Sequence, residues 1–222
     1  MFEAKGKALF ILGGSLTGLA LIRNSSALGL PSVLFSVSGE ISEKSVLTKI
    51  VRISDSDEKA FFTLRHNAAQ FKKIYLIASS DDWLRFIIRF RPKIDNLGVE
   101  VLHANNEVLN ICLNKTMFNE WLIKEHLPAP SQFTVPGLKT GDFYEQTDKL
   151  PYPLIVRPVI TRHSSEHSQV LKAQSIYNSE ELESCIAEFE KEKALPLITQ
   201  SLIPFQCQQY SVAIVRSNDG MR

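Results

Sequence analysis

A glycine-rich turn near the start of the chain is the first feature that could do chemistry. Gly13, Gly14, Ser15 and Gly18 follow a short apolar run at 8–12 and precede an amphipathic stretch. Glycine lets the backbone approach a ligand closely, and a helix that starts there offers N–H groups and a positive dipole end to an anion. The spacing is a loose version of a dinucleotide fingerprint. Two interpretations stay open here: an anion site, or a tight strand-to-helix turn without a ligand.

The second predicted strand lacks the acidic tip that would hold the ribose of a bound dinucleotide. It ends in the residues Phe-Ser-Val-Ser at 35–38, and the first carboxylate after it is Glu40. The sequence therefore supports an NAD(P) site only weakly.

The first hundred residues alternate short apolar runs with longer amphipathic ones. We expect strands at 8–12, 33–35, 50–53, 74–77 and 99–102, and helices at 16–28, 57–71 and 81–89. The first helix should bury Leu16, Leu19, Ala20 and Ile22. Apolar strands separated by helices indicate a parallel sheet covered on both faces. The predicted class is α/β, with an open, mostly parallel, Rossmann-like sheet.

The pattern of apolar and polar residues changes after a predicted helix at 115–126. Pro128 and Pro130 end this helix. We expect strands at 153–157, 169–173, 197–200 and 210–215, a helix with a serine cap at Ser179, and a hairpin turn at 217–220. These elements predict an α+β region with antiparallel pairs. Because the chain stops two residues past the turn, we expect a truncation or a longer parent protein.

Four segments of this second region occur in the order found in ATP-grasp ligases. Residues 114–135 resemble that family's lysine-opened helix with its Pro-x-Pro turn and strand, and 152–158 resemble its "P-hydrophobic-hydrophobic-V-K-P" strand, with Arg157 in place of lysine. Residues 178–182, Asn-Ser-Glu-Glu-Leu, are similar to the "S-x-E-E-L" helix start, and 196–204 are similar to the hinge strand.

The glycine-rich turn and the helix after it resemble the pre-ATP-grasp domain of carboxylate–amine ligases related to D-aspartate ligase. The resemblance implies a pre-ATP-grasp domain at 1–112 and a partial ATP-grasp domain, mostly its lid lobe, at 113–222. It also implies that the turn would contact substrate through Gly13, Gly14, Ser15 and Gly18.

The activity that this resemblance implies is the transfer of the γ-phosphoryl group of ATP to a carboxylate, followed by attack of an amine on the acyl phosphate. Phosphoryl transfer needs cations around the triphosphate. By resemblance, Lys115 and Arg157 would contact phosphates, and the loop after the lid strand would add Arg162, His163 and Ser164. Adenine would lie on the hinge residues Gln200, Ser201, Leu202 and Ile203, and ribose on Gln208 or Gln209.

The sequence departs from the family pattern in two places. The loop 161–168 contains no glycine. Gln200 or Ser201 stands where many relatives carry the glutamate that contacts adenine, and Gln208 or Gln209 stands in place of the usual ribose acid. His163 and His167 are four apart, but we interpret them as part of a polar loop because no third metal ligand is nearby. The expected cofactors are ATP and Mg²⁺, with the metal ligands in a C-terminal half absent from this chain. We therefore assign no catalytic residue and no metal ligand here.

Composition excludes several other classes of protein. The net charge is +1 and no stripe of Lys and Arg is present, so we expect no nucleic-acid partner. The N-terminal apolar run is too short for a signal or a membrane span, and three dispersed cysteines fit a reducing cytoplasm. The expected partners are a small carboxylate and an amine, and a homodimer stays open. The rival hypotheses are an NAD(P)-dependent oxidoreductase and a non-catalytic, degenerate ATP-grasp module.

Overall fold

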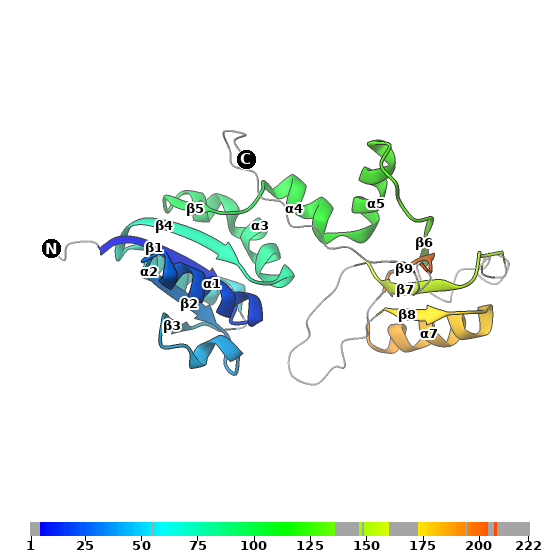
Figure 1. Ribbon diagram of the computed structural model, residues 1–222, viewed down its shortest axis with the longest axis horizontal. Helices are drawn as coiled ribbons and strands as arrows, with labels where there is room; N and C mark the ends of the chain where they lie inside the picture. Colours follow the sequence, from blue (N-terminus) through cyan, green and yellow to red (C-terminus); the bar gives the residue numbers. More distant parts are fainter. Residues whose placement is uncertain are drawn as a thin grey trace. The chain divides into compact units, whose positions relative to one another are not determined.

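The chain folds into two compact units, shown in a computed structural model (Figure 1). The structure describes residues 5–54, 56–135, 147, 149–159, 173–193, 195–203 and 207. Described residues up to Leu127 form the N-terminal unit, and those from Pro128 form the C-terminal unit. No helix among these residues has both the length and the apolar character needed to cross a bilayer.

The N-terminal unit is built on a five-stranded parallel sheet, which confirms the predicted α/β class. Its strands lie in the order β3-β2-β1-β4-β5. They are β1 (Lys5–Leu12), β2 (Ser32–Ser36), β3 (Lys49–Arg52), β4 (Phe71–Ala78) and β5 (Val99–Val101). Because the order reverses between β1 and β4, the carboxyl ends of these two strands border the point where open α/β sheets usually hold ligands.

Helices cover both faces of this sheet, as the apolar strands predict. On one face α1 (Leu16–Ala27) packs Ile22 against Ile11 and Leu34. On the other face α2 (Asp57–Ala68) and α3 (Asp81–Asp95) pack around Phe10 and Phe35 of the sheet. The central strands β1, over 8–12, and β2, over 33–35, are apolar on both sides because each side meets a helix.

The predicted apolar face of α1 is wrong for Leu16 and Ala20. Leu16 is 71% exposed and Ala20 is exposed too, whereas Gly18, Ile22 and Ser25 are buried. The close approach of α1 to the glycine-rich turn occurs at Gly18. Positions two residues away point to the opposite side of a helix, because each residue turns it by about 100°.

Two predicted helix ends also differ from the structure. The second helix ends at Ala68, and Phe71 belongs to β4, where its ring lies edge-on to Phe10 at 5.6 Å between centroids. The third helix continues through Pro92 to Asp95. Proline has no N–H for the carbonyl of Ile88. The side-chain amide of Asn106 donates to that carbonyl instead, at 3.1 Å, so the helix continues.

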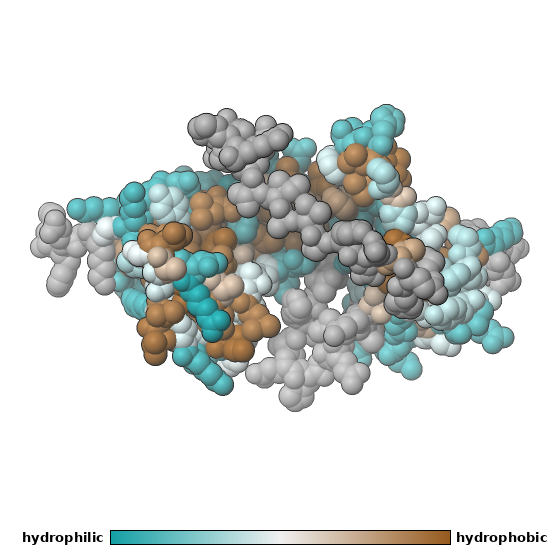
Figure 2. Space-filling view, in the orientation of Figure 1, coloured by the Kyte–Doolittle hydropathy of each residue, from teal (hydrophilic) through white to brown (hydrophobic). Residues whose placement is uncertain are grey.

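Two short helices follow β5. The first, α4 (Asn106–Leu113), was not predicted, and the second, α5 (Lys115–Lys124), ends two residues before the predicted boundary at 126. Asn114 caps α5, since its side-chain oxygen accepts hydrogen bonds from the backbone N–H groups of Thr116 and Met117. Apolar side chains are exposed on α5 (Figure 2), among them Phe118, Trp121 and Ile123.

The C-terminal unit is an antiparallel sheet with one helix, which confirms the predicted α+β region. Its strands lie in the order β6-β9-β7-β8, and α7 (Ser179–Lys191) packs on one face through Leu182, Ile186 and Phe189. The strands are β6 (Gln132–Val135), β7 (Leu154–Pro158), β8 (Gln174–Ile176) and β9 (Leu197–Ser201).

Three predictions for this region differ from the structure or lie outside the described residues. The strand expected at 169–173 lies largely outside the described residues, and β8 begins just after it, at Gln174. The cap of α7 is Asn178 rather than Ser179, because the Asn178 side chain accepts from the Glu181 N–H at 2.9 Å. The strand at 210–215 and the turn at 217–220 lie outside the described residues.

Candidate functional site

The glycine-rich turn is filled by the protein's own side chains. A Cβ at Gly13, whose φ is +93°, would lie 2.6 Å from both Ser79 Oγ and Trp83 Cδ1. A Cβ at Gly14 would lie 2.7 Å from Glu40 Cβ, and one at Gly18 would lie 2.4 Å from the carbonyl oxygen of Gly13. Each of these glycines is therefore explained by close packing within the unit.

Hydrogen bonds close the same turn across the carboxyl ends of β1 and β4. The Ser79 hydroxyl donates to the Gly13 carbonyl at 2.8 Å, and the Ser15 hydroxyl lies 3.1 Å from Ser79 Oγ. Ser15 also caps α1 by accepting from the Gly18 N–H at 3.3 Å. Serine side chains therefore bridge the carboxyl ends of β1 and β4, where the strand order reverses.

Two carboxylates stand beside this turn, at the end of β2. The Ser36 hydroxyl lies 2.6 Å from Glu40 Oε2 and 2.9 Å from Glu43 Oε1, and Glu43 pairs with Arg52. Glu40 Oε2 also accepts from the Val37 N–H at 3.1 Å. A carboxylate thus does stand at the end of β2, but Glu40 is already bonded to Ser36 and Val37 and fills the space beside Gly14 that a pyrophosphate would need. The geometry therefore disfavours the dinucleotide interpretation. The assignment of the turn to substrate binding stays a prediction.

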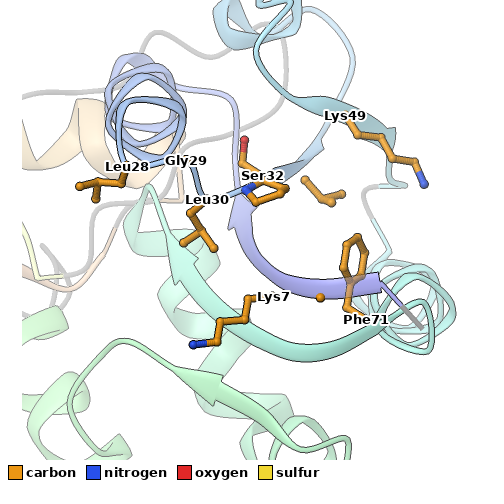
Figure 3. Close-up of a pocket in the computed structure, with 10 residues that line it drawn as sticks. Lys7, Leu28, Gly29, Leu30, Ser32, Lys49 and Phe71 are labelled. Carbon is orange, nitrogen blue, oxygen red and sulfur yellow. The ribbon is translucent and has the colours of Figure 1, made fainter. Parts of the chain in front are cut away.

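A cavity of about 630 Å³ lies elsewhere on the N-terminal unit (Figure 3). It is lined by apolar groups that include Leu28, Leu30 and Phe71, with the lysines Lys7 and Lys49 at its rim. Lys49 donates to the Asn67 side chain at 3.3 Å. The lining residues stand at the amino ends of the strands, whereas ligands of open α/β sheets bind at the carboxyl ends. We therefore do not place the candidate site here.

Lys115, the first predicted phosphate ligand, is the first residue of α5 in the N-terminal unit. Asn119 lies one turn further along the same face of this helix. It is 6% exposed, and its side-chain oxygen has no hydrogen-bond partner among the described residues. An unpaired buried oxygen is costly, so Asn119 joins Lys115 as a candidate ligand contact.

Arg157, the second predicted phosphate ligand, lies on β7 in the C-terminal unit. Residues that stand directly opposite each other in an antiparallel pair share a sheet face. The register pairs Arg157 with Ile198 and Ile155 with Gln200, and it pairs Gln200 with Gln132. The alternating residues Leu154, Val156 and Leu197 contact α7 instead. Arg157, Gln200 and Gln132 therefore share the face opposite α7.

These three side chains form one hydrogen-bonded chain across β7, β9 and β6. Arg157 Nη2 donates to Gln200 Oε1 at 2.5 Å, and Gln200 Nε2 donates to Gln132 Oε1 at 3.1 Å. Gln200 is 7% exposed, so its amide is held from both sides in a buried position. We call these three residues the Arg157 chain.

The guanidinium of Arg157 retains an unused donor. Its Nε is buried and has no hydrogen-bond partner within the described part of the chain, and no described carboxylate pairs with it. Burial lowers the pKa of Arg157 from its ordinary value. A partly buried cation with a spare N–H is suited to bind an anion, and a phosphate oxygen would meet that need.

The remaining hinge residues follow Gln200 at the end of β9. Ser201 is the last residue of the strand, and the Leu202 N–H donates to the Pro153 carbonyl at 3.0 Å. Ile203 is 64% exposed. Arg162, His163, Ser164, Gln208 and Gln209 lie outside the described residues. The structure thus brings Arg157 together with Gln200, while Lys115 belongs to the other unit.

Metal ligands were predicted to lie beyond this chain. Among the described residues, no group of three or more His, Cys, Asp or Glu side chains could hold a metal ion. The donors on the C-terminal sheet are a guanidinium and amides, which suit phosphate rather than Mg²⁺.

Gln132 and Asn119 were not predicted from the sequence. Asn119 could have been found, because it lies four residues after Lys115 on a predicted helix. Gln132 becomes visible only through the strand pairing, since 68 residues separate it from Gln200.

Comparison with known proteins supports the same overall architecture. No family model matches the chain, and no curated protein matches it. Solved structures do match. An L-amino acid ligase from Bacillus licheniformis is 17% identical, with a TM-score of 0.64, over 91% of this chain and 45% of that one. N5-carboxyaminoimidazole ribonucleotide synthetase in an ADP complex is 13% identical, with a TM-score of 0.67, over 92% and 49%.

A third similar structure is the D-alanine–D-alanine ligase from Bacillus anthracis, which is 17% identical. Its TM-score is 0.56, over 91% of this chain and 58% of that one. These enzymes are ATP-grasp ligases, and this chain has the fold of their N-terminal portion. The chain spans about half the length of the structures it matches.

Proposed function

We propose that this chain forms the ATP-binding front part of an ATP-grasp ligase, which activates a carboxylate as an acyl phosphate and joins it to an amine. The observation that carries the proposal is the buried, unpaired Nε of Arg157 on a sheet face that also holds the hinge residue Gln200. The fold supports it, because ligases of this fold have been solved with ADP and with ATP.

The described residues would act by binding and orienting the nucleotide. Arg157 would hold phosphate oxygens from the C-terminal sheet, and Lys115 would do so from the start of α5. Adenine would lie against the hinge at Ser201, Leu202 and Ile203, where backbone groups other than the Ser201 and Leu202 N–H groups, which bond within the sheet, could form hydrogen bonds with its edge. Arg162, His163 and Ser164 are proposed as further phosphate contacts, and Gln209 as the ribose contact.

The reaction has two steps, and the cations matter most in the first. A carboxylate oxygen of the substrate attacks the γ-phosphorus and ADP leaves with the electron pair of the broken P–O bond. The amine then attacks the acyl carbon, phosphate leaves, and the nitrogen loses a proton. Mg²⁺, when bound, would neutralise charge on the β- and γ-phosphates. Cations fixed by the protein stabilise the charge that moves toward ADP.

A thermal-shift comparison on the intact protein tests this proposal. A ligand that binds only the folded state at a hundred times its dissociation constant stabilises that state by about 2.7 kcal/mol. We expect ATP to raise the melting temperature and NAD(P) to leave it unchanged. A response to NAD(P) alone would favour an oxidoreductase, and no response to either would favour a non-catalytic module.

The phosphate assignments have a separate test. The double variant Lys115→Ala with Arg157→Ala should lose the ATP-dependent shift while keeping its folded circular dichroism spectrum. Full ATP binding by the folded double variant would overturn both assignments.

A further inference from the structure

We infer that Gln132 and Gln200 are positioning residues that hold Arg157 through neutral amides and so leave its positive charge available to a phosphate. The inference rests on the proposed function, because the anion it names is the polyphosphate of ATP. Nothing in the family resemblance pointed to Gln132, which enters only through its place in the Arg157 chain.

The orientation of both amides follows from the guanidinium. Arginine has five N–H donors and no acceptor, so Gln200 must turn its oxygen toward Arg157. The amino group of Gln200 then faces β6, where Gln132 must present its own oxygen. The Arg157 guanidinium thus fixes the orientation of the Gln200 amide and, through it, that of the Gln132 amide. Conversely, Gln132 supplies the acceptor that keeps the Gln200 oxygen on Arg157.

The choice of an amide at position 200 has an electrostatic consequence. A glutamate there would be almost the same size and would also accept from Arg157, but it would form an ion pair. Such a pair in a buried setting neutralises the guanidinium, and its carboxylate repels an approaching phosphate. An amide fixes the guanidinium without this loss. The Arg157 chain therefore holds Arg157 in place while no described carboxylate neutralises its charge and its Nε keeps no described partner.

Isothermal titration of ATP into the intact protein and three variants tests this inference. Gln200→Glu should weaken ATP binding at least tenfold, because it adds a negative charge beside Arg157. Gln132→Met should weaken it about threefold, because the Gln200 amide loses its partner and can flip, which costs about one neutral hydrogen bond. Gln132→Glu keeps an acceptor for Gln200 and adds its charge one residue further from Arg157, so it should weaken ATP binding less than Gln200→Glu does.

Two controls separate this effect from a general loss of structure. Gln70→Glu makes the same change in net charge in the N-terminal unit and should leave ATP affinity unchanged. Adenosine has no phosphate, so Gln200→Glu should weaken its binding much less than it weakens the binding of ATP. A merely structural role would weaken adenosine and ATP together.

The outcomes separate this inference from the proposed function. If Arg157→Met weakens ATP binding but Gln200→Glu does not, the inference is wrong and the proposed function stands. Equal losses for ATP and adenosine in Gln200→Glu would also overturn it. If the unaltered protein does not bind ATP, the proposed function fails and the inference falls with it.

Discussion

The glycine-rich turn and the C-terminal sheet both looked like anion sites, and the structure separates them. At the turn, serines pair with backbone groups and with each other, and Trp83 and Glu40 occupy the space beside the glycines. On the sheet, Arg157 keeps a buried donor without a described partner. Small residues at a strand end can therefore reflect internal packing, whereas a partly buried cation with an unpaired donor indicates a ligand.

The largest effect on stability should come from adding a methyl group at the turn. Gly13→Ala must fit a side chain at a φ of +93° and displace Ser79 and Trp83. Left-handed backbone and overpacking together should cost about 3 kcal/mol of unfolding free energy. Urea denaturation measures this cost. The matched control is Gly29→Ala, where φ is +66° but nothing lies within 4 Å, so strain alone should cost about 1 kcal/mol. Equal costs at the two positions would mean that the turn is not packed as described.

The next effect concerns ligand affinity rather than stability. Arg157→Met keeps the apolar stem and removes the charge, so ATP binding should weaken about thirtyfold, or about 2 kcal/mol, as expected for hydrogen bonds to a charged group. Isothermal titration measures the change. Arg89→Met is the control, because Arg89 is exposed and pairs with Asp57 on the N-terminal unit. An equal loss in the control would show that net charge alone governs affinity.

A smaller effect should follow from opening the serine network. Ser36→Ala removes the hydroxyl that stands between Glu40 and Glu43 and should cost about 1 kcal/mol of unfolding free energy. ATP affinity should not change, because Ser36, Glu40 and Glu43 bond to one another and are not part of the proposed nucleotide site. Ser38→Ala, at an exposed position two residues away, is the control and should be neutral. Loss of ATP affinity in Ser36→Ala would instead place nucleotide at the turn.

The smallest effect should appear in the pH dependence of the N-terminal unit. His103 Nε2 accepts the Ala78 backbone N–H at 2.8 Å, which requires the neutral imidazole. Burial, and then the charge of Arg91, lower the pKa of His103 below its ordinary value of 6.5. The unfolded state therefore binds the proton more readily, so this stabilisation is present above pH 6.5 and is lost as the pH falls. Urea midpoints at pH 7.5 and pH 5 measure the loss. His103→Gln offers an acceptor that does not titrate and should reduce the difference between the two midpoints. If the difference between the two midpoints is the same in His103→Gln as in the unaltered protein, the pH dependence arises from other groups.

The central strands β1 and β2 could be predicted because each contains an apolar run that helices bury on both sides. What could not be predicted rests on contacts between distant residues. The passage of α3 through Pro92 depends on an amide from Asn106, and the end of α2 depends on the pairing of Phe71 with β1. The eight-residue α4 and the three-residue β8 are too short to show a period.

The candidate site could be predicted only in part, for the same reason. The family resemblance pointed to Arg157 and Gln200 along the chain, but not to their mutual hydrogen bond or to Gln132. The spacing at Gly13 and Gly14 could not tell a ligand from a neighbouring side chain, because both require the absence of a Cβ. Only the positions of Trp83 and Glu40 make that distinction.

Hydrogen exchange of the intact protein, with and without ATP, distinguishes the C-terminal sheet from the glycine-rich turn as the nucleotide site. We predict that ATP slows amide exchange in β7 and β9, at 154–158 and 197–201, and leaves the turn at 13–18 unchanged. Slowed exchange at 13–18 with no change in β7 and β9 would contradict this account and would place the nucleotide at the glycine-rich turn.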